Sequence, residues 1–263
     1  METTRASKLR ILLVIMTSLS MILLCTFVLF AQEEDVAADD EQVMITIVKE
    51  VDKIIGMQDM RAKETMTIHR KDGSVRDYKL IVLTRGTEDA FAQISDPPRE
   101  KGRQMLKLGS PVWSYLPSVK KSIRVSGRSS FMGGDFENND VLKLNLVEDY
   151  KPISLERLED QYVLALKGHD LSLTYAKIKL WVSKDTFQPT KQEYYTINDK
   201  LIKSSVYSDI KKFGDFERPA VVEMVSATAK TKTILELIEF EKNVKNPDSL
   251  FRRSNLGKWF DYK

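Results

Sequence analysis

The chain has very little cysteine and histidine. Its 263 residues include a single cysteine, Cys25, and only two histidines, His69 and His169. One thiol excludes an internal disulfide, and two distant histidines do not have the spacing of a zinc site. Nucleophile elbows, phosphate-binding loops and dinucleotide-binding fingerprints are absent as well. The sequence therefore predicts no catalytic residue, no metal and no cofactor, and we expect a protein that is not an enzyme.

A large excess of one charge is also missing. The chain contains 41 Lys and Arg residues against 38 Asp and Glu residues, which leaves a net charge of +3. This balance favours neither a nucleic acid nor an acidic partner. We therefore expect no binding to nucleic acid.

Basic residues are concentrated only between residues 99 and 128, where Glu100 is the single acid. One interpretation is a solvated face on which lysines at turns and strand edges discourage aggregation. The other is a patch that meets an anionic head group or a membrane surface. The residues assigned to such a patch are Arg103, Lys120, Lys121, Arg124 and Arg128.

The N-terminus has the layout of an export signal, because basic residues precede an uncharged apolar run over residues 11–30. Cleavage after the small residue Ala31 gives a signal peptide (1–31), an acidic linker (32–41) and a folded domain (42–263). Two alternatives stay open. The apolar run is long enough, at about 20 residues, to remain as a membrane anchor. Cys25 could instead accept a lipid, although the preceding residue is bulky.

The apolar periodicity changes after the first twenty residues of this domain. Residues 42–57 carry apolar side chains at helical spacing, which predicts an amphipathic helix. From residue 60 the period becomes two, so residues 60–69 and 75–85 are predicted to be strands. The Asp72-Gly73 pair between them is typical of a β-hairpin turn.

Short strands separated by turn residues continue to residue 240, and a second helical segment is expected around residues 138–146. An antiparallel sheet of about ten strands has to curl. A curled sheet that stays half open leaves room for an apolar ligand on its concave face, if helices cover that face. The fold class predicted is mainly β (α+β), a curled antiparallel sheet with few helices.

The segment 127–140 follows neither period. Gly133 and Gly134 permit a sharp bend, and Phe131, Met132 and Phe136 place large apolar groups around it. One interpretation is a gate over a cavity, hinged at the two glycines. The other is an ordinary loop whose apolar residues fasten it to the core.

Three motifs resemble a known family. They are Trp113-Ser114-Tyr115-Leu116-Pro117, the run Phe-Met-Gly-Gly-Asp-Phe over residues 131–136, and the strand, turn and proline passage over residues 180–189. They resemble exported proteins described as outer-membrane lipoprotein-sorting proteins of the LolA-like (LolA/LolB) superfamily. The resemblance extends from about residue 42 to residue 259.

The resemblance implies a half-barrel of about eleven antiparallel strands, with helices on its concave face and a cavity for acyl chains. It implies a periplasmic, monomeric carrier or receptor of lipoprotein acyl chains or phospholipid, served by an inner-membrane transporter and an outer-membrane receptor. The alternative is a periplasmic interaction module of a transporter or envelope machine, with a cavity filled by its own side chains. Residues assigned to lipid binding are Met66, Ile68, Leu80, Val82, Met105, Trp113, Tyr115, Phe131, Met132 and Phe136.

Overall fold

The computed structural model describes residues 40–143, 145–229 and 231–261. The predicted signal peptide (1–31) and Cys25 lie outside these ranges, and no helix within them is long and apolar enough to cross a membrane. The chain divides into two compact units, Met1–Ile45 and Thr46–Lys263. The described part of the first unit is helical from residue 40 to residue 45. The sheet and everything that follows belong to the second unit.

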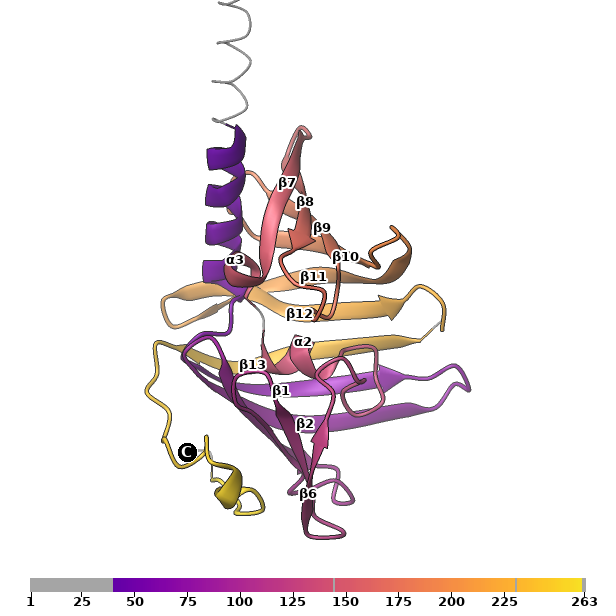
Figure 1. Ribbon diagram of the computed structural model, residues 1–263, viewed down its shortest axis with the longest axis vertical. Coiled ribbons are helices and arrows are strands. Elements are labelled where there is room, and N and C mark those ends of the chain that lie inside the picture. Colours follow the sequence, from indigo (N-terminus) through magenta and orange to yellow (C-terminus); the bar gives the residue numbers. More distant parts are fainter. Residues whose placement is uncertain (1–39, 144, 230, 262–263) are drawn as a thin grey trace, which may run out of the picture. The chain divides into compact units, whose positions relative to one another are not determined.

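One antiparallel sheet of thirteen strands forms the second unit, in the order β6-β5-β4-β3-β2-β1-β13-β12-β11-β10-β9-β8-β7 (Figure 1). Strands β6 and β7 are the two edges of the sheet and do not pair with each other, so the curled sheet stays open. The strands are β1 (Met60–His69), β2 (Val75–Arg85), β3 (Asp89–Asp96), β4 (Gln104–Lys107), β5 (Val112–Leu116), β6 (Lys121–Val125), β7 (Tyr150–Arg157), β8 (Gln161–Gly168), β9 (Lys177–Ser183), β10 (Pro189–Tyr195), β11 (Leu201–Phe213), β12 (Phe216–Ser226) and β13 (Lys232–Lys242). The predicted mainly β fold is confirmed, with thirteen strands where about eleven were expected.

Pairing of β1 with β13 joins the first half of the sheet to the second. The register runs from Met60 opposite Lys242 to His69 opposite Lys232, with one irregularity after Lys63. Every other residue of β1 is buried, as the period of two predicts. The predicted hairpin of residues 60–69 and 75–85 is present as β1 and β2.

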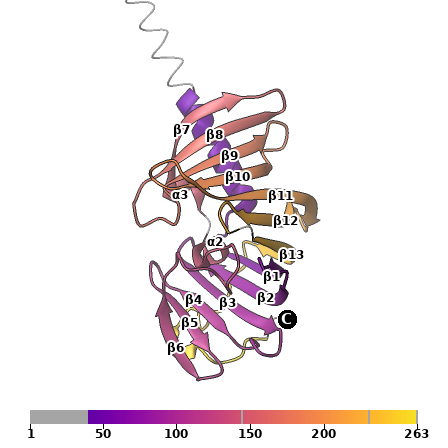
Figure 2. The same ribbon diagram turned by 90° about the vertical axis from the view of Figure 1, so that its right-hand side faces the viewer.

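Helices cover the concave face of the sheet. The predicted N-terminal helix is present over residues 40–55, and from residue 46 onward its buried side chains are Ile47, Val48, Val51 and Ile55. The single helix expected around residues 138–146 is instead two short ones, α2 (Asn138–Leu142) and α3 (Leu146–Asp149). Helix α2 packs on β2 and β3 near the middle of the sheet, and α3 packs on β7 (Figure 2).

The C-terminal segment 243–261 covers the opposite face of the first half of the sheet. Phe251 packs there with Ile81, Leu83, Phe91 and Leu106 in one apolar cluster. Buried amides of β3 and β4 fasten the segment, because Gln93 and Gln104 donate to the carbonyl oxygens of residues 260 and 258 over 2.8 and 2.6 Å. Both faces of strands β2 to β5 are therefore covered.

The segment over residues 131–136 is fastened to β1 and β13. Phe131 is fully buried and Phe136 nearly so. The Thr233 hydroxyl donates to Asp135 Oδ2 and accepts from the Asp135 N–H, both over 2.8 Å. Gly134 lies against Ile68 and Thr233 with no room for a side chain. These contacts favour the interpretation of a loop packed into the core over that of a gate hinged at Gly133 and Gly134.

We expect Gly134→Ala to destabilise the fold. A methyl group on Gly134 would lie 2.9 Å from Thr233 Oγ1 and 3.0 Å from Ile68 Cδ1, and both neighbours are buried and cannot move aside freely. The free energy of unfolding should fall by about 1–3 kcal/mol, measured by urea denaturation. Ile68→Val removes the Cδ1 contact and leaves the contact of Cγ1 at 3.2 Å, so the double variant should lose less stability than the sum of the single changes. Strictly additive losses would contradict this packing.

Candidate functional site

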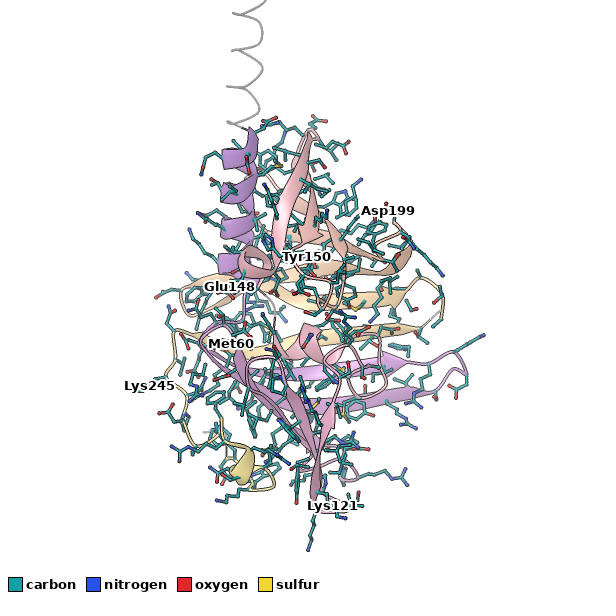
Figure 3. The ribbon with its side chains drawn as sticks, viewed as in Figure 1. Met60, Lys121, Glu148, Tyr150, Asp199 and Lys245 are labelled. Atoms are coloured by element: carbon teal, nitrogen blue, oxygen red, sulfur yellow. The ribbon has the colours of Figure 1, made fainter. Side chains whose placement is uncertain are left out.

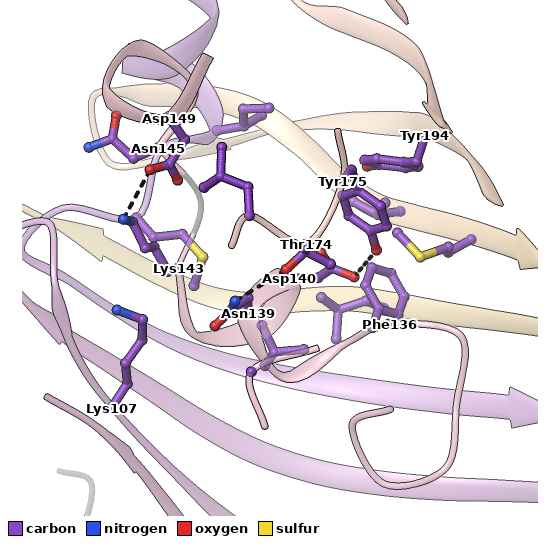
Figure 4. A pocket seen from close by; sticks show the side chains of 18 of the residues that line it. Lys107, Phe136, Asn139, Asp140, Lys143, Asn145, Asp149, Thr174, Tyr175 and Tyr194 are labelled. Carbon is purple, nitrogen blue, oxygen red and sulfur yellow. Dashed lines mark hydrogen bonds and ion pairs between the residues drawn. The ribbon is translucent and has the colours of Figure 1, made fainter. Parts of the chain in front are cut away.

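A cavity of about 780 Å³ lies at the junction of the two halves of the sheet (Figure 4). Apolar side chains form much of its wall, beside a polar part that includes Glu64, Lys107, Asp140 and Arg218. The side chains that form the apolar part are Ile55, Met57, Met60, Ala62, Phe136, Val141, Leu171, Leu173, Ile178, Pro219, Val222, Met224, Leu235, Leu237 and Phe240. They come from the N-terminal helix, β1, β9, β12, β13, α2 and the loops that precede β1, α2 and β9.

The cavity opens to solvent beside Leu171, which lines it and is nevertheless 81% exposed. Two loops meet at this mouth, the one between β6 and α2 and the one between β8 and β9. Arg128 of the first donates from Nη2 to the carbonyl of Leu171 and from Nε to that of Ser172, the latter over 3.1 Å. Asn139 Nδ2 donates to Thr174 Oγ1 over 3.1 Å. Side-chain hydrogen bonds therefore hold the two loops together.

An ion-pair network forms another part of the cavity rim. Lys143 Nζ lies 2.7 Å from Glu88 Oε1 and 3.1 Å from Asp149 Oδ1, and Lys107 Nζ lies 3.3 Å from Glu88 Oε2. Burial opposes ionisation of Glu88, but the ammonium groups of Lys143 and Lys107 outweigh it and lower its pKa. This network ties the turn between β2 and β3 to the segment that connects α2 with β7.

Helix α2 is held over the cavity by polar contacts from β11 and from the loop between β8 and β9. The buried Lys203 of β11 lies 2.9 Å from Glu137 Oε1, and the hydroxyl of Tyr175 donates to Asp140 Oδ2 over 2.7 Å. Burial raises the pKa of Asp140 to about 6. The hydrogen bonds that its carboxylate accepts from the Glu137 N–H and from Tyr175 oppose this rise. Figure 4 shows Asp140 and Tyr175 pointing toward each other across the cavity wall.

Two charged side chains in the cavity wall each have a buried atom without a hydrogen-bond partner. Glu64 of β1 is only 8% exposed, and its Oε2 has no hydrogen-bond partner. Arg218 of β12 has a buried Nε without a partner, and its guanidinium lies 4.3 Å over the ring of Phe240. Burial raises the pKa of Glu64 to about 7, with Arg218 opposing the shift, and lowers that of Arg218 to about 10. The cavity wall thus contains a carboxyl oxygen and a guanidinium N–H that make no hydrogen bond within the protein.

Most residues assigned to lipid binding lie on the cavity side of the sheet without lining the cavity. Phe136 lines it. Met66, Ile68, Leu80, Val82, Met105 and Phe131 are buried on the same face or in the segment above it. Gly134 packs on Ile68, and α2 packs on β2 and β3, so protein covers these side chains. Met132 lies beside Arg103, whose Nη1 is 3.8 Å from its sulfur.

Trp113 and Tyr115 lie on the opposite face, which corrects their assignment to the lipid-binding wall. Trp113 packs with the apolar cluster under the C-terminal segment, and Arg253 lies 3.7 Å over its ring. The ring of Tyr115 contacts Gly257. Successive residues of a strand point to opposite faces, and β5 turns Ser114 rather than its aromatic residues toward the concave side.

The basic residues between 99 and 128 do not form one patch. Lys107 is buried in the ion-pair network, Arg103 Nε lies 2.9 Å from Glu100, and Arg128 holds the mouth. Lys120, Lys121 and Arg124 are exposed around β6. Figure 3 shows Lys121 far from Met60 and Tyr150, which line the cavity.

Sequence reasoning missed Glu64, Arg218 and the loop around Leu171. A signal for Glu64 was available, because it occupies an apolar position in the alternation of β1. Arg218 had none, since charged residues are ordinary at the start of a strand that follows a turn. The loop over residues 170–174 has no motif that distinguishes it from other turns.

Comparison with known proteins assigns the chain to a family. A family model described as an uncharacterized protein matches residues 86–258, more than half of the chain. The chain belongs to this family and has the LolA-like fold. A LolA superfamily protein from Nitrosomonas europaea is 28% identical, with a TM-score of 0.71 over 80% of this chain and 98% of that one. No curated protein matches the sequence.

Two further solved structures share the LolA-like fold. An outer-membrane lipoprotein-sorting protein domain from Vibrio parahaemolyticus is 22% identical over 81% of this chain and 98% of its own, with a TM-score of 0.69. A DUF1329 family protein from Desulfovibrio piger is also 22% identical, over 82% of this chain and 99% of its own, with a TM-score of 0.71. At this identity they show the fold alone.

We expect the titration of Glu64 to contribute to the pH dependence of stability. Its pKa is about 7 in the folded protein and 4.5 as the ordinary value. The folded state therefore binds the proton of Glu64 more tightly than the unfolded state does. The resulting contribution to the free energy of unfolding is complete below pH 4.5 and is lost as the pH rises through 7. The loss amounts to about 3 kcal/mol.

Glu64→Gln removes this titration. The free energy of unfolding of wild type relative to the variant should fall by about 3 kcal/mol between pH 4 and pH 8, measured by urea denaturation at each pH. Glu156→Gln, a change at an exposed carboxylate on β7, is the control and should show no such trend. A constant difference between wild type and Glu64→Gln over this range would contradict the burial of the charge.

Proposed function

We propose that this protein is an extracytoplasmic carrier that holds an acyl chain of a lipid or lipoprotein in its cavity. The observation that carries the proposal is the cavity itself, about 780 Å³ of unfilled space with apolar side chains over much of its wall. The export-type N-terminus and the fold shared with a lipoprotein-sorting domain support it. In this proposal the protein performs no covalent chemistry, and it is loaded and unloaded by other envelope proteins, an inner-membrane transporter and an outer-membrane receptor.

The size and wall of the cavity suit one acyl chain. Its volume lies within the range of about 300–1,000 Å³ that small-molecule pockets occupy. Burial of a methylene group contributes about 0.8 kcal/mol, so a segment of about ten methylenes would supply about 8 kcal/mol before ordering costs. Met57, Met60 and Met224 are among the lining residues, and their flexible side chains can adapt to chains of different shape.

The open side of the cavity also suits exchange of the ligand. The mouth is bounded by two loops that meet through the side chain of Arg128, and Asn139 of α2 adds a hydrogen bond to the loop between β8 and β9. Separation of these loops would widen the opening beside Leu171 without disturbing any strand pairing of the sheet. We therefore place loading and release at this mouth.

Filling the cavity should abolish ligand binding. Val222 lines it, whereas Val221 precedes it on β12 and points to the other face of the sheet. We expect Val222→Trp to weaken binding of a tail-labelled fluorescent fatty acid by at least about tenfold, because the indole occupies the space of the chain. Fluorescence titration measures the Kd. Val221→Trp is the matched control and should bind like wild type. Absence of binding by folded wild-type protein would exclude the carrier function.

Opening the mouth should speed release. Arg128→Ala removes both hydrogen bonds to the loop between β8 and β9. We expect the dissociation rate of the same probe, measured by stopped-flow fluorescence, to rise about three- to tenfold, with little change in Tm because Arg128 is exposed. Arg124→Ala, a change at an exposed arginine of β6, should leave the rate unchanged. Equal rates in all three proteins would show that the ligand leaves by another route.

A further inference from the structure

The unsatisfied charges of Glu64 and Arg218 lie in the wall of the proposed acyl-chain cavity. Each approaches it from a different strand, Glu64 from β1 and Arg218 from β12. The ring of Phe240 covers one face of the guanidinium, and the buried Nε donor at its edge has no hydrogen-bond partner. Unpaired buried groups of this kind cost stability, and they occur preferentially where a ligand completes them.

The other charged groups that line the cavity are already engaged. Lys107 and Lys143 pair with Glu88, and Arg128 donates to backbone carbonyls. Tyr207 of β11, which also faces Arg218, donates its hydroxyl to Gln192 over 3.0 Å. In the described part of the chain, Arg218 is thus the basic group of the cavity that retains a buried, unused donor.

We propose that Arg218 and Glu64 form a subsite for the carboxylate of a single-chain fatty acid, whose alkyl chain lies along the apolar wall. The proposal deepens the carrier function and rests on it. The forked guanidinium matches the two oxygens of a carboxylate, and the protonated Glu64 donates an O–H to one of them. A methyl ester has no negative charge, so it cannot form the charge-assisted pair.

The charges around the subsite give binding a pH dependence. Arg218 on β12 is the charged group that acts on Glu64, while Glu64, Tyr207 on β11 and Lys242 on β13 interact with Arg218. Burial holds the pKa of Glu64 at about 7. Below this pH the neutral carboxyl donates to the ligand, and above it the carboxylate repels the ligand. Affinity for a fatty acid should therefore fall as the pH rises from 6 to 8, and affinity for its ester should not.

The test compares a tail-labelled fluorescent fatty acid with its methyl ester at pH 6 and pH 8. We expect wild type to bind the acid at least about tenfold more tightly than the ester at pH 6. Arg218→Gln should lose this preference and still bind the ester, and Glu64→Gln should lose the pH dependence. Lys212→Gln, a change at an exposed lysine of β11, is the control and should behave like wild type.

The outcomes separate this proposal from the carrier function. Equal affinity of wild type for the acid and the ester would overturn the subsite and leave the proposed carrier function standing. This comparison uses wild-type protein alone, so it does not depend on whether a variant folds. The phosphodiester of a tail-labelled lysophospholipid carries the same single negative charge as the carboxylate. If this probe binds wild type more tightly than the methyl ester does, and Arg218→Gln loses that difference, the assignment to a carboxylate is overturned. Failure of wild type to bind any of the three probes overturns the carrier function itself.

Discussion

Pairing between β1 and β13 is the interaction on which the rest of the structure depends. These strands come from opposite ends of the folded domain, and their hydrogen bonds turn two meanders into one sheet. The cavity lies at this junction, because Met60, Ala62 and Glu64 enter it from β1 while Leu235, Leu237 and Phe240 enter it from β13. A contact between residues so distant in the chain has an entropic closure cost, which the packing of the segment over residues 131–136 across the same two strands helps to offset.

The two faces of the sheet have different roles. On the convex side the C-terminal segment closes over Leu83, Phe91 and Leu106, and buried amides of β3 and β4 fasten it there. On the concave side the helices leave an unfilled cavity where the two halves of the sheet meet. Two charged side chains with a buried atom that lacks a hydrogen-bond partner, Glu64 and Arg218, line this unfilled space. An unfilled apolar space with polar groups at one place in its wall is typical of a binding site for an amphiphile.

Much of the fold could be predicted because it depends on local patterns. The alternation in residues 60–69 and the Asp72-Gly73 turn placed β1 and β2 at the observed residues, and later turn residues marked the remaining strands. The candidate site could be predicted only in part. Phe136 was identified by its family motif, but Trp113 and Tyr115 came from an equally specific motif and lie on the other face. A motif identifies residues that matter to a fold, whereas the face they occupy depends on the register of their strand.

The sequence by itself determined the strands, the curled antiparallel sheet and the resemblance to LolA-like proteins, because periodicity, turns and motifs are properties of neighbouring residues. Only the tertiary structure decided where the cavity lies and which residues line it. Strand order brings Glu64 and Arg218 into one wall although they are distant in the chain, and packing buries Ile68 beneath Gly134. Arg128 was one basic residue among several until the fold brought the loop over residues 170–174 to its guanidinium. Such proximity is set by long-range pairing, which no local pattern specifies.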